Sequence, residues 1–223
     1  MRSRTTPRHA NLQGRANTQA AVLGHAAELI AARGYHGMSM RDLAAAAGMG
    51  LSSLYTYFPS KDALLATLQT RAFESLLTSA AAADERDGTP ETHLYAFVYQ
   101  HVRYVVAHRA VMGVLVHEAG SLPAAERARV RALKERYFAV CRRLVGALAG
   151  DAGGAALDRA TYHLFGMLNW LWGWYDAERH GTAEDVARSV FALFADGVRP
   201  PVAAPRPTAL SPGLGGSADV CLR

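Results

Sequence analysis

Apolar residues recur every three or four positions along most of the chain, and this spacing predicts helices. Within residues 18–33, for example, Val22, Ala26 and Ile30 fall on one face, and Gly34 follows as a stop signal. No segment alternates with the period of two that a half-exposed strand requires. The pattern therefore predicts an all-α protein.

Capping residues mark the starts of several predicted helices. Ser39 is followed three residues later by Asp42, an acidic form of the capping box. Ser60 is a good N-cap, and Thr89 precedes Pro90, which suits a first helical position. About nine helices are expected, over residues 18–33, 40–47, 51–58, 61–83, 91–108, 110–119, 124–149, 155–179 and 183–197.

Composition changes the picture at the two ends. Residues 1–16 contain no acidic residue and are expected to form a basic, disordered arm, in which Arg2, Arg4 and Arg8 either reach an adjacent DNA groove or stay solvated. Residues 199–223 are rich in Pro, Gly and Ala without periodicity, which predicts a disordered tail.

Net charge is unevenly distributed. The first 70 residues carry seven Lys and Arg against three Asp and Glu, so +4 of the total +5 lies in the first third. This favours a polyanionic partner for that part, and a solvated basic surface is the alternative. No apolar run reaches the roughly 20 residues of a membrane span and no signal peptide is evident, so a cytoplasmic protein without membrane contact is expected.

Two short helices joined by a glycine-containing turn, with a helix before them, form a helix-turn-helix unit over residues 17–64. In such a unit the second short helix enters the DNA major groove. Leu54 and Phe58 are four residues apart and are expected in the core, which leaves the other positions of residues 51–57 for DNA. Hydroxyl groups and the Lys61 ammonium are suitable donors to phosphate.

The segment "GYHGMSMRDLAAAAGMGLSSLYTYFPSKDALLATL", residues 34–68, resembles the DNA-binding domain of the TetR family of transcriptional regulators. The resemblance implies a homodimer that binds a DNA operator, with a C-terminal ligand-binding and dimerisation domain over residues 65–198 whose ligand releases the DNA. It also implies two sets of DNA contacts. Those facing bases are Arg41, Leu51, Ser52, Ser53 and Thr56, and those contacting phosphate are Ser39, Tyr55, Tyr57 and Lys61.

The sequence departs from the family pattern at two positions. Gly50 stands where a serine or threonine is common, and Ser52 where a glycine or small residue is common. A glycine N-cap costs only a few tenths of a kcal/mol, so the helix is expected to form. The bases that this helix reads therefore stay open.

In this family the last two helices pair with those of a second subunit. The residues expected in that interface are Phe165, Gly166, Gly173, Val186, Val190 and Phe194, with the two glycines on one face. The residues expected around a hydrophobic effector are Tyr95, Tyr99, Met112, His117, Phe138, Asn169 and Trp172, although each position also suits core packing. The segment "LNWLWGWYDAERHGTAEDVA" is similar to regulators of fatty-acid and sterol breakdown, several of which respond to acyl-CoA thioesters, so an acyl-CoA is one candidate effector.

Two other classes of function fit the sequence less well. An enzyme is disfavoured because no nucleophile elbow, phosphate-binding loop or dinucleotide motif is present. No metal site or cofactor is expected, since the two cysteines and nine histidines lack ligand spacing. A ligand-independent structural DNA-binding protein of the same fold is the alternative to the sensor.

Overall fold

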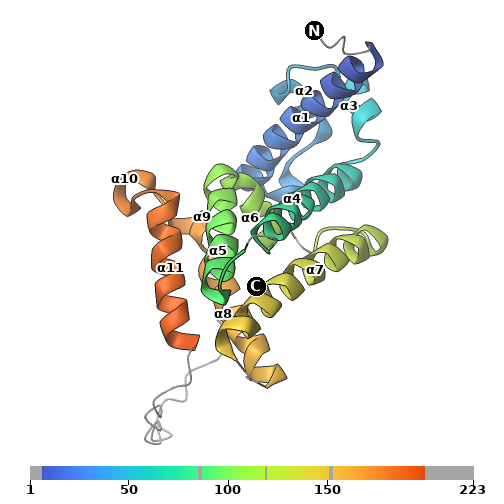
Figure 1. Cartoon of the computed structure of the whole chain (residues 1–223). Coiled ribbons are helices and arrows are strands. Elements are labelled where there is room, and N and C mark those ends of the chain that lie inside the picture. The colour runs from blue at the N-terminus through green and yellow to red at the C-terminus, as the bar shows by residue number, and fades with distance from the viewer. Residues whose placement is uncertain (1–6, 85–86, 119, 151–152, 199–223) are drawn as a thin grey trace, which may run out of the picture.

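The computed structural model describes residues 7–84, 87–118, 120–150 and 153–198, and within these ranges the chain is helical, without strands (Figure 1). The all-α prediction is confirmed. The helices are α1 (Pro7–Gly37), α2 (Met40–Ala46), α3 (Leu51–Tyr57), α4 (Lys61–Asp84), α5 (Pro90–Ala107), α6 (Arg109–His117), α7 (Ala124–Ala149), α8 (Gly154–Asn169), α9 (Leu171–Trp174), α10 (Ala177–His180) and α11 (Ala183–Val198). Over the described part of the chain, no helix has the length and apolar character needed to cross a membrane.

The first helix is longer than expected. It begins at Pro7, so residues 7–16, which were expected to be disordered, are helical instead. Pro7 is compatible with a first helical turn. Between Pro7 and Ala16 the residue that most disfavours a helix is Gly14, so local propensity allows the helix to begin at Pro7. Residues 1–6 and the tail 199–223, both expected to be disordered, lie outside the described residues.

Helices α1, α2 and α3 form a small head at one end of the molecule (Figure 1). Its core contains Ala26, Leu43, Leu54 and Phe58, all at most 1% exposed, which confirms the placement predicted for the last two. Full burial of a side chain such as Leu or Phe contributes about 1.5–3 kcal/mol. The apolar positions at helical spacing thus fix how α3 packs and which of its side chains stay outside.

The C-terminal domain is built around α5. This helix packs against α4 and α7 on one side and against α11 on another, and α8 closes the end away from the head (Figure 1). Leu94, Val98, Val102 and Val105 of α5 are fully buried at its centre. Thr89 accepts a hydrogen bond from the Thr92 N–H with Pro90 at the first position, so the predicted start of this helix is confirmed.

The helix expected over residues 155–179 is wrong in its extent, because the chain breaks into α8, α9 and α10. Tyr175 and Asp176 adopt extended backbone conformations between the last two. The Asp176 carboxylate accepts hydrogen bonds from the N–H groups of Glu178 and Arg179, so it starts a new helix. Trp172 and Gly173 lie in the short α9, before this break.

Candidate nucleic-acid interface and inter-domain cleft

The outer face of α3 carries the side chains expected to read bases. Ser52, Ser53 and Thr56 are exposed, and Leu51 is half-buried. Arg41 is exposed on the preceding α2. The Thr56 hydroxyl donates to the backbone oxygen of Ser53 at 2.7 Å, so it offers mainly its lone pairs to a base edge. The structure thus places this predicted set on the surface of the helix-turn-helix unit.

Ser39 has a structural task as well as its predicted DNA contact. Its hydroxyl donates to the Asp42 carboxylate at 2.6 Å and accepts from the Asp42 N–H at 3.1 Å. The same carboxylate accepts from the Ser39 N–H at 3.0 Å, which completes the capping box. These hydrogen bonds hold the pKa of Asp42 below its usual value. A phosphate oxygen that accepts a hydrogen bond from the Ser39 hydroxyl would have to displace Asp42 as the acceptor.

Lys61 is positioned by the aromatic ring of Tyr35. Its Nζ lies 4.4 Å from the ring centroid and donates to the backbone oxygen of His36 at 3.4 Å. The Tyr35 hydroxyl donates to the Asp62 carboxylate, and burial, followed by Asp62, raises the pKa of this phenol. A cation held over a ring at the first turn of α4 is pre-oriented for a phosphate. Sequence reasoning missed the role of Tyr35.

Tyr57 and Tyr55 occupy different environments. Tyr57 is half-buried, and the guanidinium of Arg15 lies 5.6 Å from its ring centroid. Tyr55, also on α3, is 43% exposed. Arg15 lies beside Tyr57 because α1 begins further upstream than expected. The sequence pattern did not indicate this contact.

The residues expected around an effector do not form one pocket. Tyr95 and Tyr99 stack on each other with centroids 6.2 Å apart, and Tyr95 also meets Phe191 of α11. Phe138 packs on Tyr162 and Phe165. Met112 is buried in the core, and Asn169 is half-buried at the end of α8. Apart from the Tyr95–Tyr99 pair, His117 and Trp172 are the two that the structure brings into contact.

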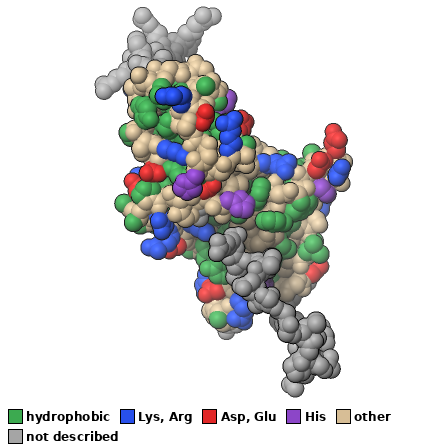
Figure 2. All heavy atoms as spheres, turned by 180° about the vertical axis from the view of Figure 1, so that it is seen from behind, with side chains coloured by type: hydrophobic (Ala, Val, Ile, Leu, Met, Phe, Trp, Pro, Cys, Tyr) green, Lys and Arg blue, Asp and Glu red, His purple; other side chains and the backbone are tan. Residues whose placement is uncertain are grey.

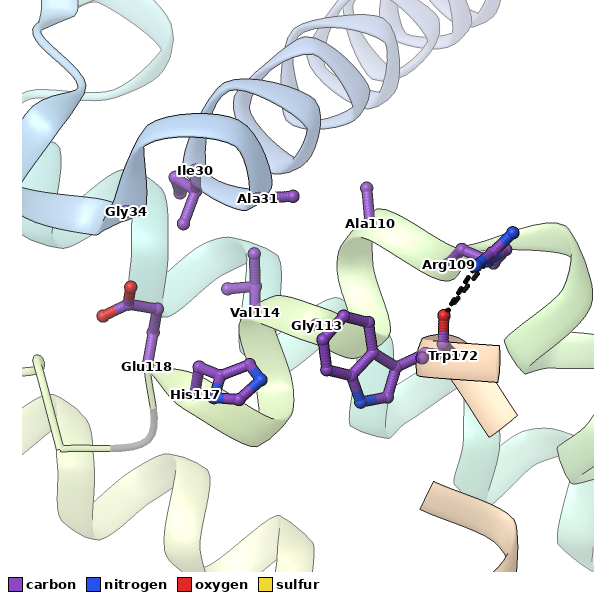
Figure 3. A pocket seen from close by; sticks show the side chains of 11 residues that line it. Ile30, Ala31, Gly34, Arg109, Ala110, Gly113, Val114, His117, Glu118 and Trp172 are labelled. Carbon is purple, nitrogen blue, oxygen red and sulfur yellow. Dashed lines mark hydrogen bonds between the residues drawn. The ribbon is translucent and has the colours of Figure 1, made fainter. Parts of the chain in front are cut away.

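These two side chains line a cleft of about 720 Å³ between the head and the C-terminal domain (Figure 3). The walls come from α1, α6 and α9. The lining residues are Ile30, Ala31, Gly34, Arg109, Ala110, Gly113, Val114, His117, Glu118, Trp172 and Gly173. The volume lies within the 300–1,000 Å³ typical of small-molecule sites. Sequence reasoning placed an effector within the C-terminal domain and did not foresee a wall supplied by α1.

One end of this cleft is held by Arg109. Its Nε and Nη2 donate to the backbone oxygen of Trp172 at 3.2 and 2.9 Å (Figure 3). The helix ends after α9, and the Asp176 N–H donates to Nδ1 of His180, so the guanidinium replaces the helical N–H donor that this carbonyl lacks. The imidazole of His117 meets the Trp172 indole nearly at a right angle, with 5.1 Å between the ring centroids.

The opposite end contains Glu118, which ties the two domains together. Its Oε1 accepts from the backbone N–H of Tyr35 in the head at 3.0 Å, and its Oε2 accepts from the Ser121 hydroxyl at 2.6 Å. Its backbone oxygen accepts from Nε2 of Gln69 in α4 at 3.1 Å. Glu118 therefore adds hydrogen bonds to the packing of α6 against α1 and α4.

The centre of the C-terminal domain is filled by aromatic side chains. Nδ1 of His101 lies 2.9 Å from the Tyr137 hydroxyl, and both rings pack against Phe165. Burial lowers the pKa of His101 to about 4, so its imidazole is neutral near pH 7. Nε2 of the same ring is buried without a hydrogen-bond partner among the described residues. Phe165, expected in the dimer interface, thus contributes to this core.

A second hollow lies between α8 and α11. Tyr162, Trp170 and Leu193 on its walls are 65%, 59% and 70% exposed. On the face seen from behind in Figure 2, hydrophobic side chains are exposed at several places among charged and polar ones. Gly166 lines this groove, whereas Gly173 lines the inter-domain cleft, so the two glycines do not share a face as expected.

The three predicted interface residues of α11 face inward or line this groove. Val186 and Val190 line it and are 6% and 8% exposed, and Phe194 is 6% exposed. They pack α11 within the protomer, and more exposed neighbours form the outer surface of the groove. Trp174 is one of these neighbours, at 44% exposure.

A three-helix head with an exposed second short helix, joined to a separate helical domain, defines a helix-turn-helix DNA-binding regulator. Family models agree with this class. Residues 22–68 match the model described as bacterial regulatory proteins of the tetR family, and residues 87–198 match the tetracyclin repressor-like C-terminal domain. The chain belongs to the TetR family, whose members bind operator DNA as dimers and respond to small-molecule effectors.

Solved structures show the same fold. A TetR-family transcriptional regulator from Bordetella parapertussis 12822 is 27% identical, with a TM-score of 0.76 over 81% of this chain and 95% of that chain. PfmR, a TetR-family regulator from Thermus thermophilus, is 28% identical, with a TM-score of 0.70 over 78% and 97%. AibR, in complex with isovaleryl coenzyme A and operator DNA, is 22% identical, with a TM-score of 0.69 over 79% and 97%. A search of curated proteins found no match.

Proposed function

We propose that this protein is a ligand-responsive transcriptional repressor that binds a pseudo-palindromic operator as a homodimer and leaves it when a hydrophobic small molecule binds. The observation that carries the proposal is the exposed row of Ser52, Ser53 and Thr56 on α3, flanked by Arg41 and Lys61. Side chains of this kind read base edges and hold phosphates. A repressor of this type acts on chromosomal DNA in the cytoplasm and needs no catalytic chemistry.

The proposed contacts divide by position. Arg41, Leu51, Ser52, Ser53 and Thr56 face the major groove. The phosphate contacts are made by Ser39, Tyr55, Tyr57 and Lys61. Arg41 can donate to a guanine edge, and Leu51 can contact a thymine methyl group.

The proposed dimer forms through α8 and α11. Exposed aromatic and aliphatic side chains line the groove between them, and large exposed apolar patches mark interaction surfaces. Two copies related by a twofold axis would present two α3 helices to half-sites about 34–36 Å apart. This arrangement explains why the operator is expected to be pseudo-palindromic.

Two apolar hollows in the structure support a hydrophobic small molecule as the effector. Apolar side chains line both hollows, and AibR, which shares this fold, was crystallised with isovaleryl coenzyme A and operator DNA. A hydrophobic small molecule is therefore the proposed effector, and an acyl-CoA is one candidate.

The test is a gel-shift experiment with the protein and its own upstream DNA. We expect a discrete complex that an unrelated duplex of equal length does not compete away. A panel of acyl-CoAs, free acids and hydrophobic drugs is then added. Release by at least one compound supports the sensor, whereas binding of several compounds without any release favours the ligand-independent structural DNA-binding protein. No complex with upstream DNA would overturn the operator assignment.

A further inference from the structure

We propose that the cleft between α1, α6 and α9 binds an apolar molecule that carries a single acidic group, and that this ligand acts directly on the orientation of the DNA-binding head. The site differs from the aromatic core of the C-terminal domain, which is filled. The regulatory part of this inference rests on the proposed repressor function, whereas ligand binding itself can be tested without DNA.

The shape of the cleft favours a flat ligand. Ala31, Gly34, Ala110 and Gly113 contribute little side-chain volume, and the Trp172 indole forms the facing wall (Figure 3). At Gly113 a Cβ atom would lie 3.6 Å from the indole, an ordinary van der Waals distance, so the ring packs directly against α6 at this position. Small residues opposite an indole make a slot in which an aromatic or alicyclic ring can stack.

The indole can adjust to a ligand. The described residues supply no hydrogen-bond partner for its buried Nε1, so packing and the backbone alone hold the ring. His117, on the edge of the cleft, is exposed and contacts the same ring. A ligand that stacks on the indole therefore breaks no hydrogen bond of the Trp172 side chain.

Charge at the two ends gives the ligand an orientation. Arg109 uses two N–H groups on the Trp172 carbonyl, and a guanidinium has five, so others remain for an anion. Glu118 lies nine positions further on, about 13 Å along a helix, and its carboxylate repels a second anion. The cleft is therefore matched to an acidic group at the Arg109 end and an apolar body beyond it.

The same charges disfavour a coenzyme A thioester at this site. Coenzyme A carries several phosphate groups, and phosphates are held by clusters of cations or backbone N–H groups. The cleft offers one permanent cation, Arg109, together with His117. The free acid is thus the better match than its thioester.

The position of the cleft supplies the regulatory step. A ligand there contacts Ile30, Ala31 and Gly34 in the head and α6 in the C-terminal domain at once. The ligand binds more tightly to one orientation of the head than to others, so it shifts the population towards that orientation. Since Glu118 joins α6 to the backbone of Tyr35, the shift changes the separation of the two α3 helices in a dimer. A changed separation no longer matches the half-site spacing.

Pyrenebutyric acid is a suitable probe because it combines a flat ring system with one carboxylate. Binding to the full-length protein is measured by calorimetry and by energy transfer from tryptophan to pyrene. Its primary amide and its coenzyme A thioester are measured in parallel. We expect the acid to bind once per protomer, at least about tenfold more tightly than either derivative, because only the acid places a single charge beside Arg109.

Two substitutions locate the site. Ala31→Phe fills the slot from the α1 side, and Arg109→Gln removes the cation; each is expected to weaken binding at least about tenfold. Their matched controls are Ala132→Phe and Arg131→Gln, both at exposed positions of α7, which should bind like the wild type. Circular dichroism checks that each variant folds, and Ala31→Phe decides the outcome if Arg109→Gln is unstable.

The results separate the site from the function. The proposed site is overturned if Ala31→Phe binds the acid with wild-type affinity. It is also overturned if the wild type binds the thioester more tightly than the acid and Arg109→Gln binds the acid as the wild type does. Acid binding that is lost in both variants but never loosens the operator complex overturns the regulatory step alone. A protein that binds the acid and no upstream DNA contradicts the repressor and leaves the site standing.

Discussion

Lys61 shows how single residues in this protein are positioned by their neighbours. The ring of Tyr35 lies beneath its ammonium group, and the hydroxyl of that tyrosine is bonded to Asp62. The lysine is therefore held at the start of α4 before DNA arrives. Pre-orientation of this kind reduces the entropy that a long side chain loses on binding.

Lys61→Gln is expected to weaken operator binding and to lower its dependence on salt. Each lost phosphate contact reduces the slope of log affinity against log salt by about one. Fluorescence anisotropy across a series of salt concentrations measures both quantities. Lys134→Gln, at an exposed position of α7, is the control. A slope equal to that of the wild type would show that Lys61 does not contact phosphate.

His101 makes stability depend on pH. Its pKa is about 6.5 in an unfolded chain and about 4 in the buried site, so between these values the unfolded state binds a proton that the folded state does not. The contribution of this residue is complete above pH 6.5 and falls as the pH drops towards 4. Between pH 7 and pH 5 the loss is on the order of 2 kcal/mol.

Urea unfolding at pH 7 and pH 5 measures this effect. His101→Gln is expected to be less stable at pH 7, because Tyr137 loses its partner, but to lose less stability on acidification than the wild type. His25→Gln, at a half-exposed position of α1, controls for replacement of a histidine. If His101→Gln and the wild type lose equal stability, burial of a neutral imidazole is not the cause.

Among the elements, α2 shows the closest agreement between sequence and structure. The spacing of Ser39 and Asp42 predicts a capping box, and the structure forms both of its hydrogen bonds. These contacts involve residues three positions apart, so they depend on local sequence alone. In contrast, at the break between α8 and α10 the carbonyl of Trp172 accepts its hydrogen bonds from Arg109, a residue more than sixty positions away.

Ser39→Ala is expected to destabilise the protein by about 1 kcal/mol, since the N-cap hydrogen bond of α2 is lost. Ser52→Ala changes an exposed serine of α3 and should alter the free energy of unfolding by less than about 0.5 kcal/mol. Urea unfolding without DNA compares the two variants. Equal stabilities would mean that the Ser39 hydroxyl does not cap α2 in solution.

At the scale of the whole molecule, the groove between α8 and α11 presents the exposed apolar surface described above. Leu193 is its most exposed large hydrophobic side chain, at 70%. Burial of such a surface against a second copy would remove apolar area from water at roughly 25 cal/mol per Å² before the costs of association.

Leu193→Asp is therefore expected to shift the protein from dimer to monomer and to weaken operator binding at least about tenfold. Analytical ultracentrifugation gives the oligomeric state, and anisotropy gives the affinity. Val116→Asp places the same charge at an exposed valine of α6, outside the groove, and should leave the dimer intact. A dimeric Leu193→Asp would place the interface elsewhere.

The sequence by itself determined the features that depend on short spacings. Helical periodicity, the caps at Ser39 and Thr89, and the burial of Leu54 and Phe58 all follow from residues within a few positions of one another. The tertiary structure alone decided where hollows form. The inter-domain cleft requires α1, α6 and α9 to meet. His117 and Trp172 line it, whereas Tyr95, Phe138 and Met112 do not. Side-chain packing between distant segments sets such spaces, and no local pattern encodes it.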